Sequence, residues 1–127
     1  MKKILLTFAL LVAALCAGAQ NIRMAEDIPA AAADILRPRL AQMLEAGGIT
    51  LSGDDSLRVS ACIMKRVETP GGQVALEIEL KTALGEADEV FPIKGVGDND
   101  EDAWSRAVKQ FLPRSKNAQK FIEKLKQ

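Results

Sequence analysis

A glycine-rich stretch followed by acidic residues is the first place in this sequence where a ligand could bind. Lys94, Gly95 and Gly97 precede a run of acids that begins at Asp98, and the amides that follow such glycines can hold a phosphate at the start of a helix. A P-loop would end in Gly-Lys-Ser/Thr, and a dinucleotide fingerprint would have a third glycine. The acids would also repel a phosphate. We therefore expect a tight strand-to-helix turn in which the glycines allow close backbone packing, with nucleotide binding as the weaker alternative.

The same acidic residues invite comparison with a calcium-binding loop. Asp98, Asp100 and Asp102 occupy alternate positions, as at the start of an EF-hand loop. The sixth position of such a loop needs glycine but is Ala103, and the twelfth needs glutamate but is Lys109. We therefore expect the acids to cap the N-terminus of a helix, where carboxylates interact favourably with the helix dipole.

Side chains that could catalyse a reaction are scarce. The sequence contains no histidine, which removes the commonest metal ligand and the commonest general base. Glu77 and Glu79 could be a pair of catalytic carboxylates, but their alternate spacing next to Lys81 is typical of the solvated face of a strand. We expect no catalytic residue, no metal site and no cofactor.

Three further features are explained by packing or by solvation. Trp104 lies on the apolar stripe of a predicted helix, so we expect it in the core rather than as a ligand platform. Cys62 lies in a predicted strand, where we expect a buried small hydrophobe, with a reactive or intermolecular thiol as the alternative. The lysines between Lys116 and Lys126 should form the wet face of the last helix, and contact with a partner or an anionic surface is the alternative.

The first nineteen residues have the composition of an export signal. Lys2 and Lys3 precede an apolar run from Ile4 to Leu15, and Ala17-Gly18-Ala19 forms a small-residue cleavage pattern before Gln20. We expect cleavage near Ala19-Gln20 and a mature protein in the periplasm or outside the cell.

An uncleaved anchor and a lipoprotein are the alternatives to a cleaved signal peptide. The apolar run is shorter than the roughly 20 residues of a membrane-spanning helix. Leu15 precedes Cys16, at a position where lipoproteins carry a small residue such as Gly, Ala or Ser. We therefore expect neither a lipid anchor at Cys16 nor a membrane span after cleavage.

Removal of residues 1–19 leaves 108 residues, which is enough for one domain. The mature chain would have 15 basic and 17 acidic residues. Its net charge would be −2, which gives no electrostatic attraction for nucleic acid. Cys62 would be the only cysteine, which excludes an intramolecular disulfide. We expect no nucleic-acid partner.

The N-terminal part of the mature chain predicts one helix after a short lead. Residues 20–27 could form a flexible lead or an edge strand at Ile22 to Met24. Apolar residues then recur at helical spacing until Gly47 and Gly48, which are typical of a helix C-terminus. Pro38 should kink this helix or mark its true start, which makes residues 38–46 its safest part.

Three strands are predicted next. Residues 57–64 and 74–82 alternate between apolar and polar side chains, and the turn at 69–72 joins them into an antiparallel hairpin with one solvated face. Val90 to Lys94 forms a third strand, in which Pro92 indicates an edge position or a bulge.

Two helices close the chain. Apolar residues from Ala103 to Phe111 share one helical face, Pro113 ends that helix, and Ser115 to Asn117 can cap a final one. The order helix, strand, strand, strand, helix, helix predicts a single α+β domain over residues 28–127. It should contain a small antiparallel sheet of three strands, or four with Ile22 to Met24, and helices on one face.

One stretch also resembles a known kind of domain. Phe91 to Gly97, followed by Ala103 and Ala107 and preceded by the pattern of Leu36 to Ile49 and two strands, resembles small exported proteins of Gram-negative envelopes. Their domain is similar to the N-terminal part of TolB. The same type occurs in the curli secretion channel subunit and in outer-membrane lipoproteins that activate penicillin-binding proteins. The resemblance covers about Ile28 to Leu125.

The resemblance implies a non-enzymatic envelope module that binds a protein partner or assembles with copies of itself. The alternative is a periplasmic protein that binds a small molecule or an ion with the turn from Gly95 to Asp102. The residues that an interaction or this turn would use are Lys94, Gly95, Gly97, Asp98, Asp100 and Trp104.

Overall fold

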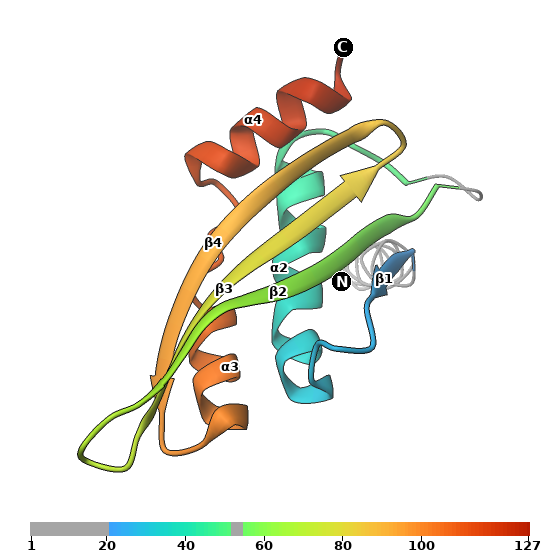
Figure 1. Cartoon of the computed structure of the whole chain (residues 1–127). Helices are drawn as coiled ribbons and strands as arrows, with labels where there is room; N and C mark the ends of the chain where they lie inside the picture. Colours follow the sequence, from blue (N-terminus) through green and yellow to red (C-terminus); the bar gives the residue numbers. More distant parts are fainter. Residues whose placement is uncertain (1–20, 52–54) are drawn as a thin grey trace, which may run out of the picture.

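The fold is described here for residues 21–51 and 55–127 of a computed structural model. A four-stranded sheet has helices on one face, so the predicted α+β class is confirmed (Figure 1). The predicted signal peptide, its cleavage site and Cys16 lie outside the described residues. The elements in chain order are β1 (Ile22–Met24), α2 (Ala30–Ala46), β2 (Leu57–Glu68), β3 (Val74–Leu84), β4 (Ala87–Gly97), α3 (Asp100–Val108) and α4 (Lys116–Leu125).

The sheet is mixed, with the strand order β1-β2-β3-β4. The predicted antiparallel hairpin is confirmed, since β2 pairs antiparallel with β3, and β3 pairs antiparallel with β4. The edge strand at Ile22–Met24 is confirmed too, but it runs parallel to β2, with Ile22 opposite Leu57. The prediction of a purely antiparallel sheet was therefore wrong at β1. The physical reason is that α2 lies between β1 and β2 as a crossover connection.

The helix α2 contains Pro38 in its interior, so Pro38 does not mark its true start. It starts at Ala30 and continues through Pro38 to Ala46, so the prediction that residues 38–46 are its safest part covered only half of it. Proline removes one helical hydrogen bond. Burial of apolar side chains on both sides of Pro38 offsets that loss: Ala32, Ala33, Leu36, Leu40, Met43 and Leu44. The predicted C-terminus is confirmed, because Gly47 is the C-cap and Gly48 has a φ of +73°.

The strand β4 is longer than predicted. It extends from Ala87 to Gly97, so Gly95 and Gly97 belong to the strand and only Asp98 and Asn99 connect it to α3. The expected turn from Gly95 to Asp102 is therefore wrong in its position. The inference from Pro92 is confirmed, because β4 forms an edge of the sheet.

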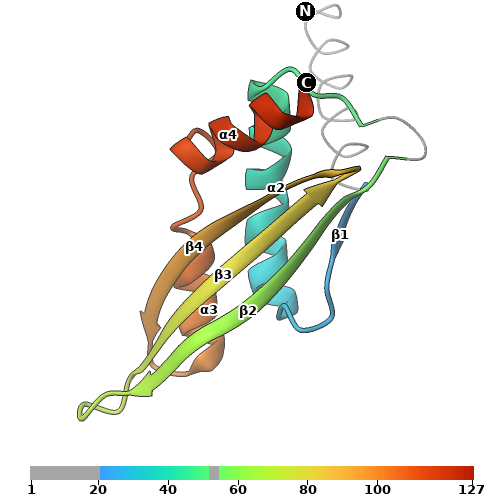
Figure 2. The ribbon, with the colours of Figure 1, turned by 45° about the horizontal axis from the view of Figure 1, so that its top comes forward.

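The core lies between the inner face of the sheet and the three helices (Figure 2). Trp104 is 5% exposed and belongs to this core, as predicted. The rings of Phe91 and Phe111 have centroids 4.8 Å apart, and they join β4 to the segment after α3. Ser115 caps α4, as predicted, and its hydroxyl accepts a hydrogen bond from the Ala118 amide at 3.2 Å.

Two arginines of α2 hold neighbouring segments by hydrogen bonds to backbone carbonyls. Arg37 Nη1 donates to the carbonyl of Ile22 in β1 at 2.6 Å. Arg39 Nη1 donates to the carbonyl of Phe111 at 3.0 Å. The helix thus ties the edge strand and the α3–α4 connection to the same layer.

Candidate functional site

The distal half of β2, residues 60–68, is the part of the sheet that its neighbours cover least. β1 pairs only with Leu57 to Val59, and α3 lies against β3 and β4. Within residues 21–51 and 55–127, no strand pairs with the outward side of residues 60–68. The β2–β3 hairpin also extends past the end of α3 (Figure 2). We call residues 60–68 the distal β2 edge.

Backbone hydrogen-bonding groups point outward along the first part of this edge. The amide of Leu57 donates to the carbonyl of Asn21 at 3.0 Å, and the carbonyl of Val59 accepts a hydrogen bond at 2.9 Å from the segment after β1. Alternate residues of a strand direct these groups to the same side. The N–H and C=O groups of Ala61 and Ile63 therefore point away from β3, where an added strand could pair with them.

Apolar side chains flank these backbone groups. Ile63, Met64 and Val67 are 48%, 58% and 41% exposed. Ile63 lies opposite the buried Ile78 and so points to the helix side, whereas Val67 lies opposite Ala75 on the outer face. The prediction of a strand with one buried face therefore holds at Leu57 and Val59 but is wrong at Ile63.

A β-bulge divides the distal β2 edge. The pairing with β3 passes from Ile63 opposite Ile78 to Lys65 opposite Glu77, which leaves Met64 as the extra residue. A bulge bends its strand and changes the direction of nearby side chains. It places Met64, the most exposed apolar side chain of β2, between the two segments that continue the regular ladder.

Cys62 is exposed, so the expectation of a buried cysteine was wrong. It lies opposite Glu79, on the outer face of the sheet. The physical reason is that the helices cover only the other face (Figures 1 and 2). A cysteine out of phase with Leu57 and Val59 therefore faces solvent.

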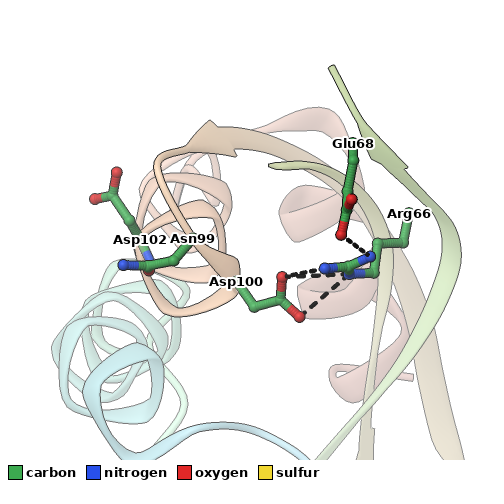
Figure 3. A network of polar contacts seen from close by, with 5 residues as sticks. All are labelled: Arg66, Glu68, Asn99, Asp100 and Asp102. Carbon is green, nitrogen blue, oxygen red and sulfur yellow. Dashed lines mark hydrogen bonds and ion pairs between the residues drawn. The ribbon is translucent and has the colours of Figure 1, made fainter. Parts of the chain in front are cut away.

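An arginine joins the distal β2 edge to the N-terminus of α3 (Figure 3). Arg66 Nη2 donates to Asp100 Oδ1 at 2.8 Å, and Arg66 Nε lies 3.2 Å from both carboxylate oxygens. Arg66 Nη1 also forms an ion pair with Glu68 Oε1 at 3.2 Å. The hydrogen bonds from Arg66 hold the pKa of Asp100 below its usual range, and those with Asp100 and then Glu68 raise the pKa of Arg66.

Helix capping at this turn is confirmed, but the N-cap side chain is Asn99, and of the three predicted acids only Asp102 contributes its side chain to these hydrogen bonds. Asn99 Oδ1 accepts a hydrogen bond from the amide of Asp102 at 2.8 Å, and Asp102 Oδ2 accepts one from the amide of Asp98 at 3.1 Å. Asp102 Oδ2 also pairs with Arg106 at 3.3 Å. Among the residues that the structure describes, no group of three or more His, Cys, Asp or Glu side chains is placed to hold a metal ion.

The residues predicted for an interaction or a turn do not meet in one place. Lys94 lies on the outer face and pairs with Glu77 at 3.2 Å. Gly95 and Gly97 lie against the backbone of α3, and Trp104 is in the core. Asp98 and Asp100 line a shallow polar hollow together with Arg66, Glu68 and Asn99.

The sequence interpretation missed Ile63, Met64, Val67 and Arg66 as surface residues. One signal was available: after Ile63 the chain reads Met-Lys-Arg-Val-Glu, where apolar and charged residues no longer alternate. A strand whose alternation ends has no consistently buried face. This loss of period marks the point at which β2 leaves the core.

Two further findings extend beyond this site. In the part of the chain described here, no helix combines the length and apolar character needed to cross a bilayer. No protein-family model matches the sequence, and neither a curated protein nor a solved structure matches it. The resemblance to the N-terminal part of TolB therefore stays a prediction.

Proposed function

We propose that this chain is an exported, non-enzymatic module of the cell envelope that binds a protein partner along the distal β2 edge. One observation carries the proposal: Ile63, Met64 and Val67 are exposed beside backbone groups of the same strand with which no described strand pairs. An open strand edge is a template for an added strand from another chain. Main-chain hydrogen bonds would supply affinity, and the apolar side chains would supply specificity.

The surroundings of the edge favour selective rather than indiscriminate pairing. The bulge at Met64 and the charged side chains of Lys65 and Arg66 are features that restrict edge-to-edge contact between sheets. Arg66 is held by Asp100 at the end of α3. A partner strand would therefore meet a hairpin that is already fixed to the helical layer.

The envelope location is supported by the predicted signal peptide at residues 1–19 and by the resemblance to envelope modules. Mass spectrometry of the mature N-terminus tests it. A chain that begins at Gln20 agrees with the proposal. A chain that retains Met1, or one that begins at a lipid-bearing Cys16, would contradict export as a cleaved and unanchored protein.

Site-specific photo-crosslinking tests the binding surface. We expect a benzophenone amino acid at Met64 to give one defined adduct with a protein of the producing cell. The same group at Gln119, which is exposed on α4, should not give it. An adduct that forms equally at both positions, or at neither, would contradict the proposal.

A substitution then tests the role of the apolar side chains. Once the crosslinked protein is identified and purified, Val67→Lys should weaken its binding, because a charge would replace an apolar contact on the added strand. Lys120→Ala on α4 is the control and should leave the affinity unchanged. Equal affinity of the wild type and Val67→Lys would place the interface elsewhere.

The alternative, a small-molecule or ion-binding protein that uses Gly95 to Asp102, has less support. Asp100 is engaged by Arg66, and Asp102 is engaged by Arg106 and the Asp98 amide. Gly95 and Gly97 face α3 rather than solvent. We therefore favour the distal β2 edge as the functional surface.

A further inference from the structure

A cluster of three cations lies on the sheet face that the helices leave uncovered. Arg23 of β1 is directly opposite Arg58 of β2, and Lys81 of β3 is opposite Ser60, two residues further along β2. Residues opposite one another in a sheet share a face. Arg58 lies opposite Ala83, out of phase with the buried Thr82, so the cluster belongs to the outer face.

These cations have no protein partner in the described residues. Five ion pairs are formed there, and the side chains of Arg23, Arg58 and Lys81 take part in none of them. Like charges at directly opposed positions destabilise a sheet. The pairing of Arg23 with Arg58 therefore has a cost that no ion pair among residues 21–51 and 55–127 offsets.

A hollow with an apolar lining lies between these side chains. Arg23, Arg58 and Lys81 line it together with the outer-face residues Ala83 and Val90. Two acids lie at its other end. Glu89 is already paired with Lys124 at 3.1 Å, and Asp88 is opposite Ala83. The three cations therefore outnumber the single unpaired carboxylate, and the hollow is positively charged.

We propose that this cationic hollow binds a small ligand that carries a phosphate or carboxylate group on an apolar body. The guanidinium group of arginine forms paired hydrogen bonds with both kinds of oxyanion. Arg23 and Arg58 would hold the anionic group with Lys81 and the Ser60 hydroxyl beside it. The apolar body would cover Ala83 and Val90, which lie on the same outer face as the cations. This site shares only Ser60 with the distal β2 edge and does not depend on the proposed function.

Titration with three probes at constant ionic strength tests the site by amide chemical shifts. The probes are phenyl phosphate, phthalate and inorganic phosphate, with sodium chloride as the background. We expect shifts in residues 58–60 and 81–83 and tighter binding of phenyl phosphate than of inorganic phosphate, because the ring covers apolar surface. Binding of phenyl phosphate alone assigns a phosphate ligand, binding of phthalate alone assigns a carboxylate ligand, and binding of both supports the shared chemistry.

A charge-matched pair of variants separates a site from general attraction. Arg58→Gln should weaken binding roughly tenfold, because it removes a charged, paired contact. Lys65→Gln removes the same charge from the outer face of β2 outside the hollow and should leave the affinity unchanged. Probes that bind no better than chloride, or equal losses in the two variants, would overturn the proposal. Neither result would affect the crosslinking test at Met64.

Discussion

A methyl group placed on Gly95 would stand 2.9 Å from the Cα of Ala107 and closer still to the Ala107 amide nitrogen and the Ala103 carbonyl oxygen. The strand β4 and the helix α3 therefore touch backbone to backbone. Gly97 makes a similar approach to the start of α3, near Ala103. This contact positions the N-terminus of α3, and with it Asp100, beside the distal β2 edge.

Gly95→Ala should destabilise the fold by about 2 kcal/mol or more, because a backbone cannot move aside as a side chain can. Urea denaturation measures the change. Gly71→Ala is the matched control, since its nearest neighbour would be Thr69 Oγ1 at 3.9 Å. We expect that variant to stay within about 0.5 kcal/mol of the wild type. Equal stability of the two variants would contradict the close packing.

Asn99→Ala should cost about 1 kcal/mol of unfolding free energy, because it removes the side-chain cap on the amide of Asp102. Asp98→Ala is the control: the Asp98 contact to Asp102 uses its backbone amide, which the substitution keeps. Thermal unfolding of both variants measures the difference. A loss in Asp98→Ala as large as that in Asn99→Ala would rule out the cap as its cause.

The Arg66–Asp100 contact should make the stability of the fold depend on pH in the acidic range. The folded pKa of Asp100 lies below its ordinary value of 3.8, so the contact contributes fully above that pH and is lost as the pH falls through the folded pKa. Asp100→Asn should therefore be less stable than the wild type at neutral pH, and the difference in melting temperature should shrink well below pH 3.8.

Glu101→Gln is the control for this pH dependence. It neutralises an acid of the same helical turn, and Glu101 makes no ion pair in the described chain. We expect the melting temperature of Glu101→Gln at neutral pH to differ less from that of the wild type than the melting temperature of Asp100→Asn does. A difference for Asp100→Asn that stays constant from neutral pH to acid would show that the ion pair is not its origin.

The thiol of Cys62 should react in the folded protein. In a protein that begins at Gln20 it is the sole cysteine, and it is exposed. Ellman's reagent should modify it at a rate close to that in urea, because access rather than unfolding limits the reaction. Cys62→Ser should abolish the signal and change stability by only about 0.5 kcal/mol. Modification that requires unfolding would contradict the exposure.

The sequence predicts the elements of the fold better than their extent. The alternation in residues 74–82 and the apolar stripe at Ala103, Trp104 and Ala107 both appear as predicted, because each faces one continuous core. Two predictions were wrong for a shared reason: that Pro38 could mark the start of α2, and that Gly95 lies in a turn. Local propensity ends a helix or a strand at such residues, whereas packing against distant elements continues it.

The candidate site was harder to predict than the core. Ile63 continues the alternation of Leu57 and Val59, which predicts burial, and the only local sign of its exposure is the loss of alternation in the residues after it. Its exposure depends on where α2 and α3 lie in space. Arg66 and Asp100 are 34 residues apart, and only the crossing of the hairpin and α3 brings them together.

The order of the strands along the chain bears on how the protein folds. Short turns join β2 to β3 and β3 to β4, whereas β1 is separated from β2 by the whole of α2. Contacts that are close in sequence form first, since their loops cost less entropy to close. The long strands can thus assemble while the edge of β2 at Leu57 to Val59 is still bare and prone to aggregation. Docking of the three residues of β1 would protect the newly folded chain from aggregation, because it covers the edge of β2 at Leu57 to Val59. Only the distal β2 edge, where the proposed partner would bind, would then stay open.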